Sequence, residues 1–177
     1  ISFSKLLKEG QGRSLSVFDF DHTIAIADAW VHVTHADGSK EKLDPGEFAV
    51  YEQKPGDSFD FSEFNKVLHN PKLIRRNANK LKRELDRAGR TSSHKVTILT
   101  ARGLGYPVRH YLARLGLTAY VVPLGTGDPQ AKADWIEAHI RKGYTKIFFI
   151  DDSQKNVDAV KKLQSKYPDI SITVELA

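Results

Sequence analysis

Short apolar runs, rich in β-branched and aromatic residues, alternate with helical patterns along most of this chain of 177 residues. The runs predict five strands, at 15–20, 96–100, 119–124, 146–150 and 170–176. Apolar residues spaced by three and four predict helices at 105–115, 132–142 and 156–167. This alternation favours an α/β domain in which right-handed crossovers join a parallel sheet of about five strands.

The segment between the first two predicted strands is long and interrupts the alternation. Residues 29–44 predict a β-hairpin with an Asp-Gly turn at 37–38. Residues 62–68 predict a short helix, although the surrounding pattern is mixed. We therefore expect a single domain, 1–177, that carries a small insertion at approximately 24–70.

The composition limits the class of protein. The chain has no cysteine, which excludes disulfides, thiolate metal sites and cysteine nucleophiles and fits a cytoplasmic protein. Apolar runs stay well short of the roughly 20 residues that span a bilayer, so we expect no membrane partner. The first 13 residues do not form a secretory signal. Phe3, Leu6 and Leu7 predict a short amphipathic turn that packs on the domain.

Polar side chains stand where four of the predicted strands end. They are Asp19, Asp21, Thr100, Arg102, Lys132, Asp151 and Asp152. Considered singly, an acid or hydroxyl at such a junction is usually a helix N-cap, and a lysine there is usually solvated. Ligands of open parallel sheets bind beyond the carboxyl ends of the strands, so together these residues predict one site at that edge.

The same side chains suit phosphoryl chemistry. Several carboxylates close together require a cation, and hard oxygen ligands favour Mg²⁺. A lysine and a hydroxyl beside such a cluster suit the spread negative charge of a phosphoryl group. A carboxylate can itself attack phosphorus and form an aspartyl-phosphate. The chain has no GxxxxGK[ST] loop, which excludes nucleotide binding by that motif.

Four segments resemble, in order, the four motifs of the haloacid dehalogenase (HAD) superfamily of phosphotransferases. They are DFDHT at 19–23, ILTAR at 98–102, the lysine of DPQAKADW at 128–135, and FFIDDSQKNV at 148–157. The resemblance extends from residue 17 to about residue 160. It implies a Rossmann-like three-layer sandwich with a β-hairpin flap and a minimal cap insertion, and an open site.

The resemblance also implies the catalytic roles. Asp19 would be the nucleophile and a Mg²⁺ ligand. Asp21 would protonate the leaving oxygen and then activate the water that hydrolyses the aspartyl-phosphate, and its backbone carbonyl would reach the metal.

The remaining motif residues would bind the phosphate and the metal. Thr100 and Lys132 would hold the phosphoryl oxygens, Asp151 would complete the metal site, and Asp152 would be a direct or outer ligand. For Arg102 two alternatives stay open: contact with a substrate phosphate, or an ion pair at the start of a helix.

Three histidines lie near these motifs in the sequence. We expect His22, between Asp21 and Thr23, to be a loop residue that helps to set the turn. His32 and His35 are three residues apart on a predicted strand and therefore point to opposite faces, so we expect them on the surface of the flap rather than at a metal.

The strongest positive charge lies in the segment 72–95, which has nine basic residues and two acidic ones. The part at 71–90 predicts a helix, with Pro71 at its start and Gly89 as its C-terminal cap. Its basic face is either solvated or an electrostatic site for nucleic acid. It lacks interleaved aromatic residues, which argues against stacking of single-stranded bases.

These features together predict a Mg²⁺-dependent phosphatase that acts on a phosphomonoester through an aspartyl-phosphate. A nucleotide, a nucleic-acid end and a small phosphorylated metabolite all stay open as substrates. A non-catalytic HAD-like phosphate-binding or scaffold protein is the alternative. A receiver-type phosphoacceptor module is disfavoured because Thr100 stands where its aspartate would be. The sequence leaves the oligomeric state open.

Overall fold

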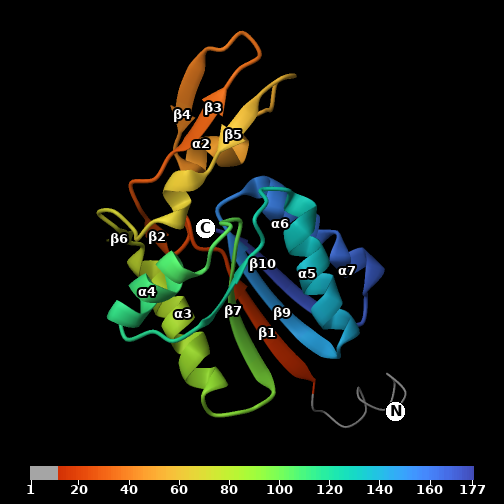
Figure 1. Ribbon diagram of the computed structural model, residues 1–177. Coiled ribbons are helices and arrows are strands. Elements are labelled where there is room, and N and C mark those ends of the chain that lie inside the picture. Colours follow the sequence, from red (N-terminus) through yellow and green to blue (C-terminus); the bar gives the residue numbers. More distant parts are fainter. Residues whose placement is uncertain (1–11) are drawn as a thin grey trace.

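The computed structural model describes residues 12–177 and is built around a five-stranded parallel sheet (Figure 1). In spatial order the strands are β10 (Ser171–Leu176), β9 (Tyr144–Asp151), β1 (Arg13–Phe18), β7 (His94–Thr100) and β8 (Tyr120–Pro123). All neighbouring strands of this sheet pair in parallel. The predicted α/β class and the five strands are confirmed. The predicted amphipathic turn at Phe3, Leu6 and Leu7 lies outside the described residues.

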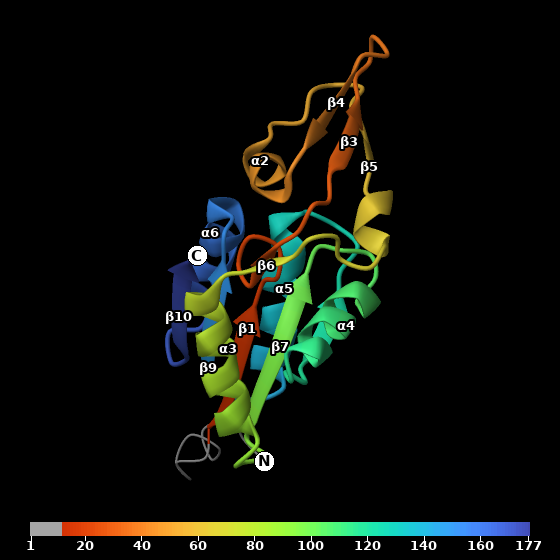
Figure 2. The same cartoon turned by 90° about the vertical axis from the view of Figure 1, so that its left-hand side faces the viewer.

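Helices cover both faces of the sheet (Figures 1 and 2). One face is covered by α3 (Arg75–Ala88) and α4 (Tyr106–Arg114), and the other by α5 (Pro129–Arg141), α6 (Gln154–Lys161) and the short α7 (Leu163–Lys166). The arrangement is a three-layer α/β sandwich, consistent with a Rossmann-like fold. Among residues 12–177, none of the helices combines the length and apolarity needed to cross a membrane.

The central strand β1 supplies side chains to both layers of the core. Leu15 and Val17 pack in one apolar cluster with Ile136 of α5, whereas Phe18 packs in the other with Leu81 of α3. Alternate residues of a strand point to opposite faces, so a strand buried on both sides must be apolar at nearly every position. This burial explains why Leu15, Val17 and Phe18 are all apolar, with only Ser16 between them.

The strand order reverses at β1. Strands β7 and β8 follow it on one side, and β9 and β10 occupy the other. In an open α/β sheet the crossover helices on the two sides diverge at this point and leave a crevice beyond the carboxyl ends of the strands. The fold therefore places β1 and β9 next to the crevice.

An inserted lobe, residues 27–71, stands above the carboxyl edge of the sheet (Figures 1 and 2). The predicted hairpin is confirmed as β3 (Val31–Thr34) and β4 (Lys40–Leu43), with Gly38 at φ 83° in the turn. The lobe also contains two elements that we did not predict, α2 (Pro45–Val50) and β5 (Ser58–Asp60), which pairs with β3.

The predicted short helix at 62–68 is only a 3₁₀ turn, η1 (Ser62–Asn65). Val31, Val33 and Phe64 form a small apolar core for the lobe.

A two-stranded ribbon joins the lobe to the sandwich. It consists of β2 (Ala25–Ile26) and β6 (Lys72–Leu73), which are antiparallel. The prediction that α3 begins at Pro71 is wrong, because residues 72–73 pair with β2 and the helix starts only at Arg75.

Two further predictions concern helix ends. The prediction that Gly89 caps α3 is confirmed. The single helix expected at 156–167 is instead two helices, α6 and α7, which meet at Lys162.

Candidate active site

Residues from three strand ends and one helix meet at the crevice. Asp19 directly follows β1, Thr100 ends β7 and Asp151 ends β9, while Lys132 lies in the first turn of α5. The amide of Asp19 donates to the carbonyl of Ile150 at 2.9 Å, which continues the β1–β9 pairing into the site. Parallel pairing therefore brings residues more than 100 positions apart to one edge.

The ammonium group of Lys132 lies between two carboxylates. Its Nζ donates to Oδ1 of Asp19 and to Oδ2 of Asp151, both at 2.7 Å. The Lys132 side chain is 4% exposed, and those of Asp19 and Asp151 are 8% and 0% exposed. The hydroxyl of Thr23 donates to the second oxygen of Asp19 at 2.9 Å. These contacts fix the orientation of the Asp19 carboxylate.

Asp152 adds a third carboxylate to the two that Lys132 contacts. Asp19, Asp151 and Asp152 each offer an oxygen, and these oxygens lie within 4.8 Å of one another. Three carboxylates that converge in this way form a hard-oxygen donor set, which fits Mg²⁺. The expectation for Asp21 was contact through its backbone carbonyl, and its carboxylate is not part of this cluster.

Two acids of the cluster, Asp19 and Asp152, have raised pKa values. Burial raises the pKa of Asp19 to about 7, although Lys132 opposes the shift. Burial also raises the pKa of Asp152 to about 8, and Asp19 and Asp151 add to that shift. Burial disfavours the charged form of Lys132, but the two carboxylates outweigh it and raise the lysine pKa. The positive charge of a single lysine therefore does not neutralise three carboxylates. A divalent cation bound beside it would supply the missing positive charge.

Asp151 is held by two partners that the sequence analysis missed. The amide nitrogen of Asn156 donates to both of its carboxylate oxygens, at 3.1 and 3.0 Å, and the backbone N–H of Ser153 donates to Oδ1 at 2.8 Å. Asn156 lies in the first turn of α6, so its position in the segment SQKNV was the available signal.

Asp21 pairs with Arg102. The Nε of Arg102 donates to one oxygen of Asp21 at 2.8 Å, and its Nη2 donates to the other at 2.7 Å. The third nitrogen, Nη1, donates to the carbonyl of Phe64 in the lobe at 3.0 Å. Arg102 thus forms an ion pair, as one of our two alternatives states, but the pair is not at the start of a helix, because α4 begins only at Tyr106. Its partner is the acid predicted to carry the proton.

Thr100 is almost completely buried, at 1% exposure. Its hydroxyl oxygen accepts a hydrogen bond from the backbone N–H of Arg102 at 3.2 Å. The other predicted site residues, Asp19 and Lys132 among them, line a cleft between the sheet edge and the lobe. Thr100 is not among the lining residues. Thr100 therefore lies at the carboxyl end of β7 but does not line the cleft.

A cleft of about 650 Å³ lies between the sheet edge and the lobe. Its floor is polar and comes from the sandwich, with Asp19, Lys132, Asp151 and Asp152. Its other side comes from the lobe and includes Phe48, Phe59 and Phe61. The predicted open site is thus partly roofed.

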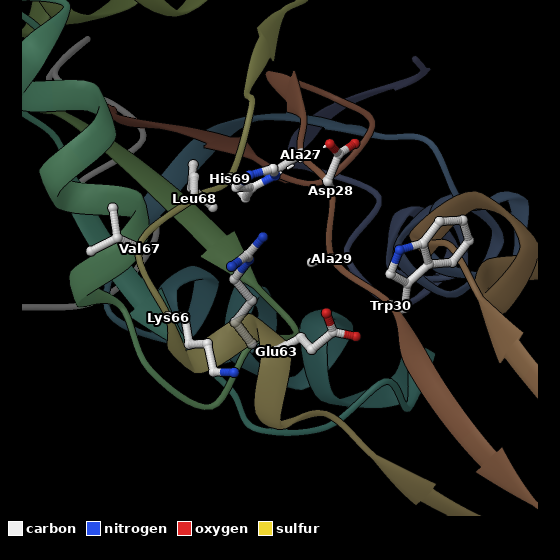
Figure 3. Close-up of a pocket in the computed structure, with 10 residues that line it drawn as sticks. Ala27, Asp28, Ala29, Trp30, Glu63, Lys66, Val67, Leu68 and His69 are labelled. Carbon is white, nitrogen blue, oxygen red and sulfur yellow. Dashed lines mark ion pairs between the residues drawn. The ribbon is translucent and has the colours of Figure 1, made fainter.

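A second cavity, of about 490 Å³, lies between the two connections that join the lobe to the sandwich (Figure 3). One wall is Ala27–Trp30 and the other includes Glu63, Lys66 and His69, while Arg102 lines both this cavity and the cleft. His69 and Asp28 lie close together at one edge of it, with 3.4 Å between Nδ1 and Oδ2. Arg102 therefore separates the two spaces.

The three histidines near the motifs do not lie together in one site. His22 has a φ of 59°, as a turn residue does, and its buried Nε2 has no partner within the described part of the chain. His32 pairs with Glu63 at 2.5 Å. His35 lies between Asp57 and Glu41, at 2.7 and 3.1 Å, and its side chain is 18% exposed, so it is more buried than the surface position we predicted.

Comparison of the chain with protein-family models, with curated proteins and with solved structures gave no significant match.

Proposed function

We propose that this protein is a Mg²⁺-dependent phosphomonoester hydrolase of the HAD type. The observation that carries the proposal is the position of Lys132, 2.7 Å from both Asp19 and Asp151, with Asp152 completing a metal-sized group of oxygens. Each of these residues belongs to one of the motifs that suggested the family. Their convergence at the strand-order reversal supports the proposal, because a ligand of this fold would bind there.

The proposed reaction has two steps. The carboxylate of Asp19 attacks phosphorus, and the bond from phosphorus to the leaving oxygen breaks as Asp21 gives that oxygen a proton. Water then attacks the phosphorus of the aspartyl-phosphate, Asp21 takes the proton, and phosphate leaves with Asp19 restored.

The neighbouring residues prepare both steps. Thr23 and Lys132 orient the Asp19 carboxylate, and Lys132 would also bind a phosphoryl oxygen once a substrate is present. Arg102 orients Asp21. Asp19, Asp151 and Asp152 would hold Mg²⁺, which supplies charge stabilisation for the transferring phosphoryl group when bound.

The lobe would act as a minimal cap over this site. It is larger than the flap that we expected, since it adds a third strand and a helix to the hairpin. A cytoplasmic location, as expected from the absence of cysteine, remains part of the proposal.

A nucleic-acid end is a second candidate substrate, favoured by one observation on α3. Lys80, Lys82 and Arg87 pair with acids, but Arg75, Arg76 and Arg83 are exposed and have no ion-pair partner among residues 12–177. Unpaired exposed arginines are the groups that contact phosphates. The alternative of a non-catalytic phosphate-binding or scaffold protein is less well supported, because both acids of the first motif are present.

The proposal is tested by hydrolysis of p-nitrophenyl phosphate by the full chain. We expect activity with Mg²⁺, none with EDTA, and at least a thousandfold loss in Asp19→Asn with an unchanged circular dichroism spectrum. The matched control is Asp169→Asn, which replaces an exposed acid far along the chain. This variant should retain activity. Full activity in Asp19→Asn would contradict the mechanism, and a folded wild-type protein without activity would favour the binding-protein alternative.

A further inference from the structure

The lobe presents a set of aromatic rings to the cleft. Phe48 packs edge-on against Phe59 and Phe61, with ring centroids 5.4 and 5.3 Å apart, and Phe59 and Phe61 are 6.1 Å apart. Tyr51 and Phe64 extend the group at its two ends. All five rings line the cleft. We call Phe48, Tyr51, Phe59, Phe61 and Phe64 the aromatic wall.

The rings of the aromatic wall differ in exposure, and Phe61 is the most open of them. Phe64 is 6% exposed and belongs to the buried core of the lobe, whereas Phe61 is 41% exposed. Phe48, Tyr51 and Phe59 are partly buried. A large apolar side chain left open in a cleft marks a binding surface more often than a structural one.

The wall also carries no charge. Among the described residues that line the cleft, those of the lobe are all uncharged, and the charged ones all belong to the sandwich. The cleft therefore has two chemically distinct halves. The half at Lys132 suits a phosphoryl group, and the half at Phe61 suits an apolar, planar group.

The size of the cleft agrees with this division. Its volume of about 650 Å³ lies in the range of sites for drug-sized ligands, and a phosphoryl group alone would leave most of it empty. A substrate that fills the cleft would thus place its leaving group against the lobe.

We propose that the aromatic wall binds a planar aromatic ring in the leaving group of the phosphomonoester, a proposal that rests on the function proposed above. The ring stacks on Phe61 and packs against the edges of Phe48 and Phe59. Such stacking is insensitive to ring identity, because every aromatic ring has a π-face. The base of a nucleoside monophosphate and the ring of an aryl-type phosphate share this chemistry.

Two pairs of substrates test the contribution of the ring. Within each pair the same kind of phosphate ester bond is broken, and the two members differ in the aromatic ring. Adenosine 5′-monophosphate and ribose 5-phosphate differ by the base, and benzyl phosphate and cyclohexylmethyl phosphate differ by ring planarity. We expect kcat/KM to be at least tenfold higher for the planar member of one or both pairs. A preference confined to the first pair identifies a nucleoside, and one confined to the second an aryl group. Equal values within both pairs would overturn the proposal.

Variants of Phe61 test whether this ring causes the preference for planar substrates. In Phe61→Ala, and less strongly in Phe61→Leu, the ratio of kcat/KM for the planar member to that for its partner should fall towards one. Val50→Ala is the matched control, since Val50 is an exposed apolar residue of the same lobe, 72% accessible, and does not line the cleft. That variant should keep the wild-type ratio. An unchanged ratio in Phe61→Ala would contradict the proposal.

A binding measurement separates this proposal from the proposed function. Calorimetry with Asp19→Asn and Mg²⁺ should show at least tenfold tighter binding of adenosine 5′-monophosphate than of ribose 5-phosphate, or of benzyl than of cyclohexylmethyl phosphate. If no ester is hydrolysed but this selectivity is seen, the enzyme proposal fails and the ring site stands. If esters are hydrolysed but binding is equal within both pairs, the ring site fails alone.

Discussion

The guanidinium of Arg102 donates to both carboxylate oxygens of Asp21, from Nε at 2.8 Å and from Nη2 at 2.7 Å. It also stacks on Phe64, with 4.9 Å from Cζ to the ring centroid, and donates to the carbonyl of that residue. One buried side chain thus links the proposed proton carrier to the lobe above it. Changes at Arg102 should affect both stability and turnover.

We predict that Arg102→Ala lowers the free energy of unfolding by about 3 kcal/mol, because it removes one partner of a largely buried ion pair. Arg102→Lys should recover part of the stability but lower kcat with little change in KM, since lysine does not reproduce the two-point contact that orients Asp21. Thermal denaturation and steady-state kinetics check these outcomes. Arg141→Ala is the control: it removes an exposed arginine from Glu137, which still pairs with Lys166, and it should cost about 1 kcal/mol or less.

The kinetic pattern also decides between the two roles considered for Arg102. A raised KM with an unchanged kcat in Arg102→Lys would mean that the guanidinium binds the substrate phosphate, as one of our sequence-based alternatives states.

The sandwich was predictable because its strands are buried on both faces. Such strands appear as continuous apolar runs, so the ends of β1, β7 and β9 and the site residues there could be located from sequence. The pair between Asp21 and Arg102 was not predictable, because 81 residues separate the partners and nothing local distinguishes this arginine from one that binds phosphate.

The lobe was less predictable for a different physical reason. Its strands have only three or four residues, and β4, KEKL, is mostly exposed, so the apolar alternation is weak. Its core is a small apolar cluster whose buried members are spread from Ala29 to Phe64. Register in such a small sheet depends on tertiary packing, which a periodicity argument does not capture.

A second prediction concerns Asn156. Replacing it by alanine should weaken Mg²⁺ binding by about 10- to 100-fold, because the amide that holds both oxygens of Asp151 is lost. Gln154→Ala removes an amide on the same helix that, among residues 12–177, donates only to the exposed Asp158, and it should leave the affinity unchanged. Calorimetric titration with MgCl₂ measures both. Equal affinities in the two variants would show that Asp151 needs no such support.

A third prediction concerns pH. Burial raises the pKa of Asp19 to about 7 and that of Asp152 to about 8, from 3.8 in the unfolded chain. The folded chain without metal therefore keeps protons that the unfolded chain releases above about pH 4, so their contribution to stability falls as pH rises through 7 to 8. We expect Tm in EDTA to fall between pH 6 and pH 8.5, and to fall less in Asp152→Asn.

Mg²⁺ should reverse this trend, since it binds the ionised carboxylates and its binding releases protons. The rise in Tm on adding Mg²⁺ should accordingly be larger at pH 8.5 than at pH 6. A rise that is independent of pH would place the metal away from Asp19 and Asp152.

A fourth prediction tests the exposed arginines of α3. If a nucleic-acid end is the substrate, replacing Arg75, Arg76 and Arg83 by glutamate should weaken binding of a phosphorylated oligonucleotide and flatten its dependence on salt. Hydrolysis of p-nitrophenyl phosphate should not change, because these residues do not line the cleft. Fluorescence anisotropy at several salt concentrations measures the binding. Wild-type affinity in the triple variant would identify this face of α3 as merely solvated.

The ribbon formed by β2 and β6 has a consequence for how such a chain can diversify. Ala25 pairs with Leu73 and Ile26 with Lys72, so the points at which the chain leaves the sandwich and returns to it are hydrogen-bonded neighbours. The two connections are thus held together by the pairing of β2 with β6, whatever the length of the segment between them. The join is therefore a point at which evolution could exchange the lobe while Asp19, Lys132 and Asp151 keep their positions at the sheet edge.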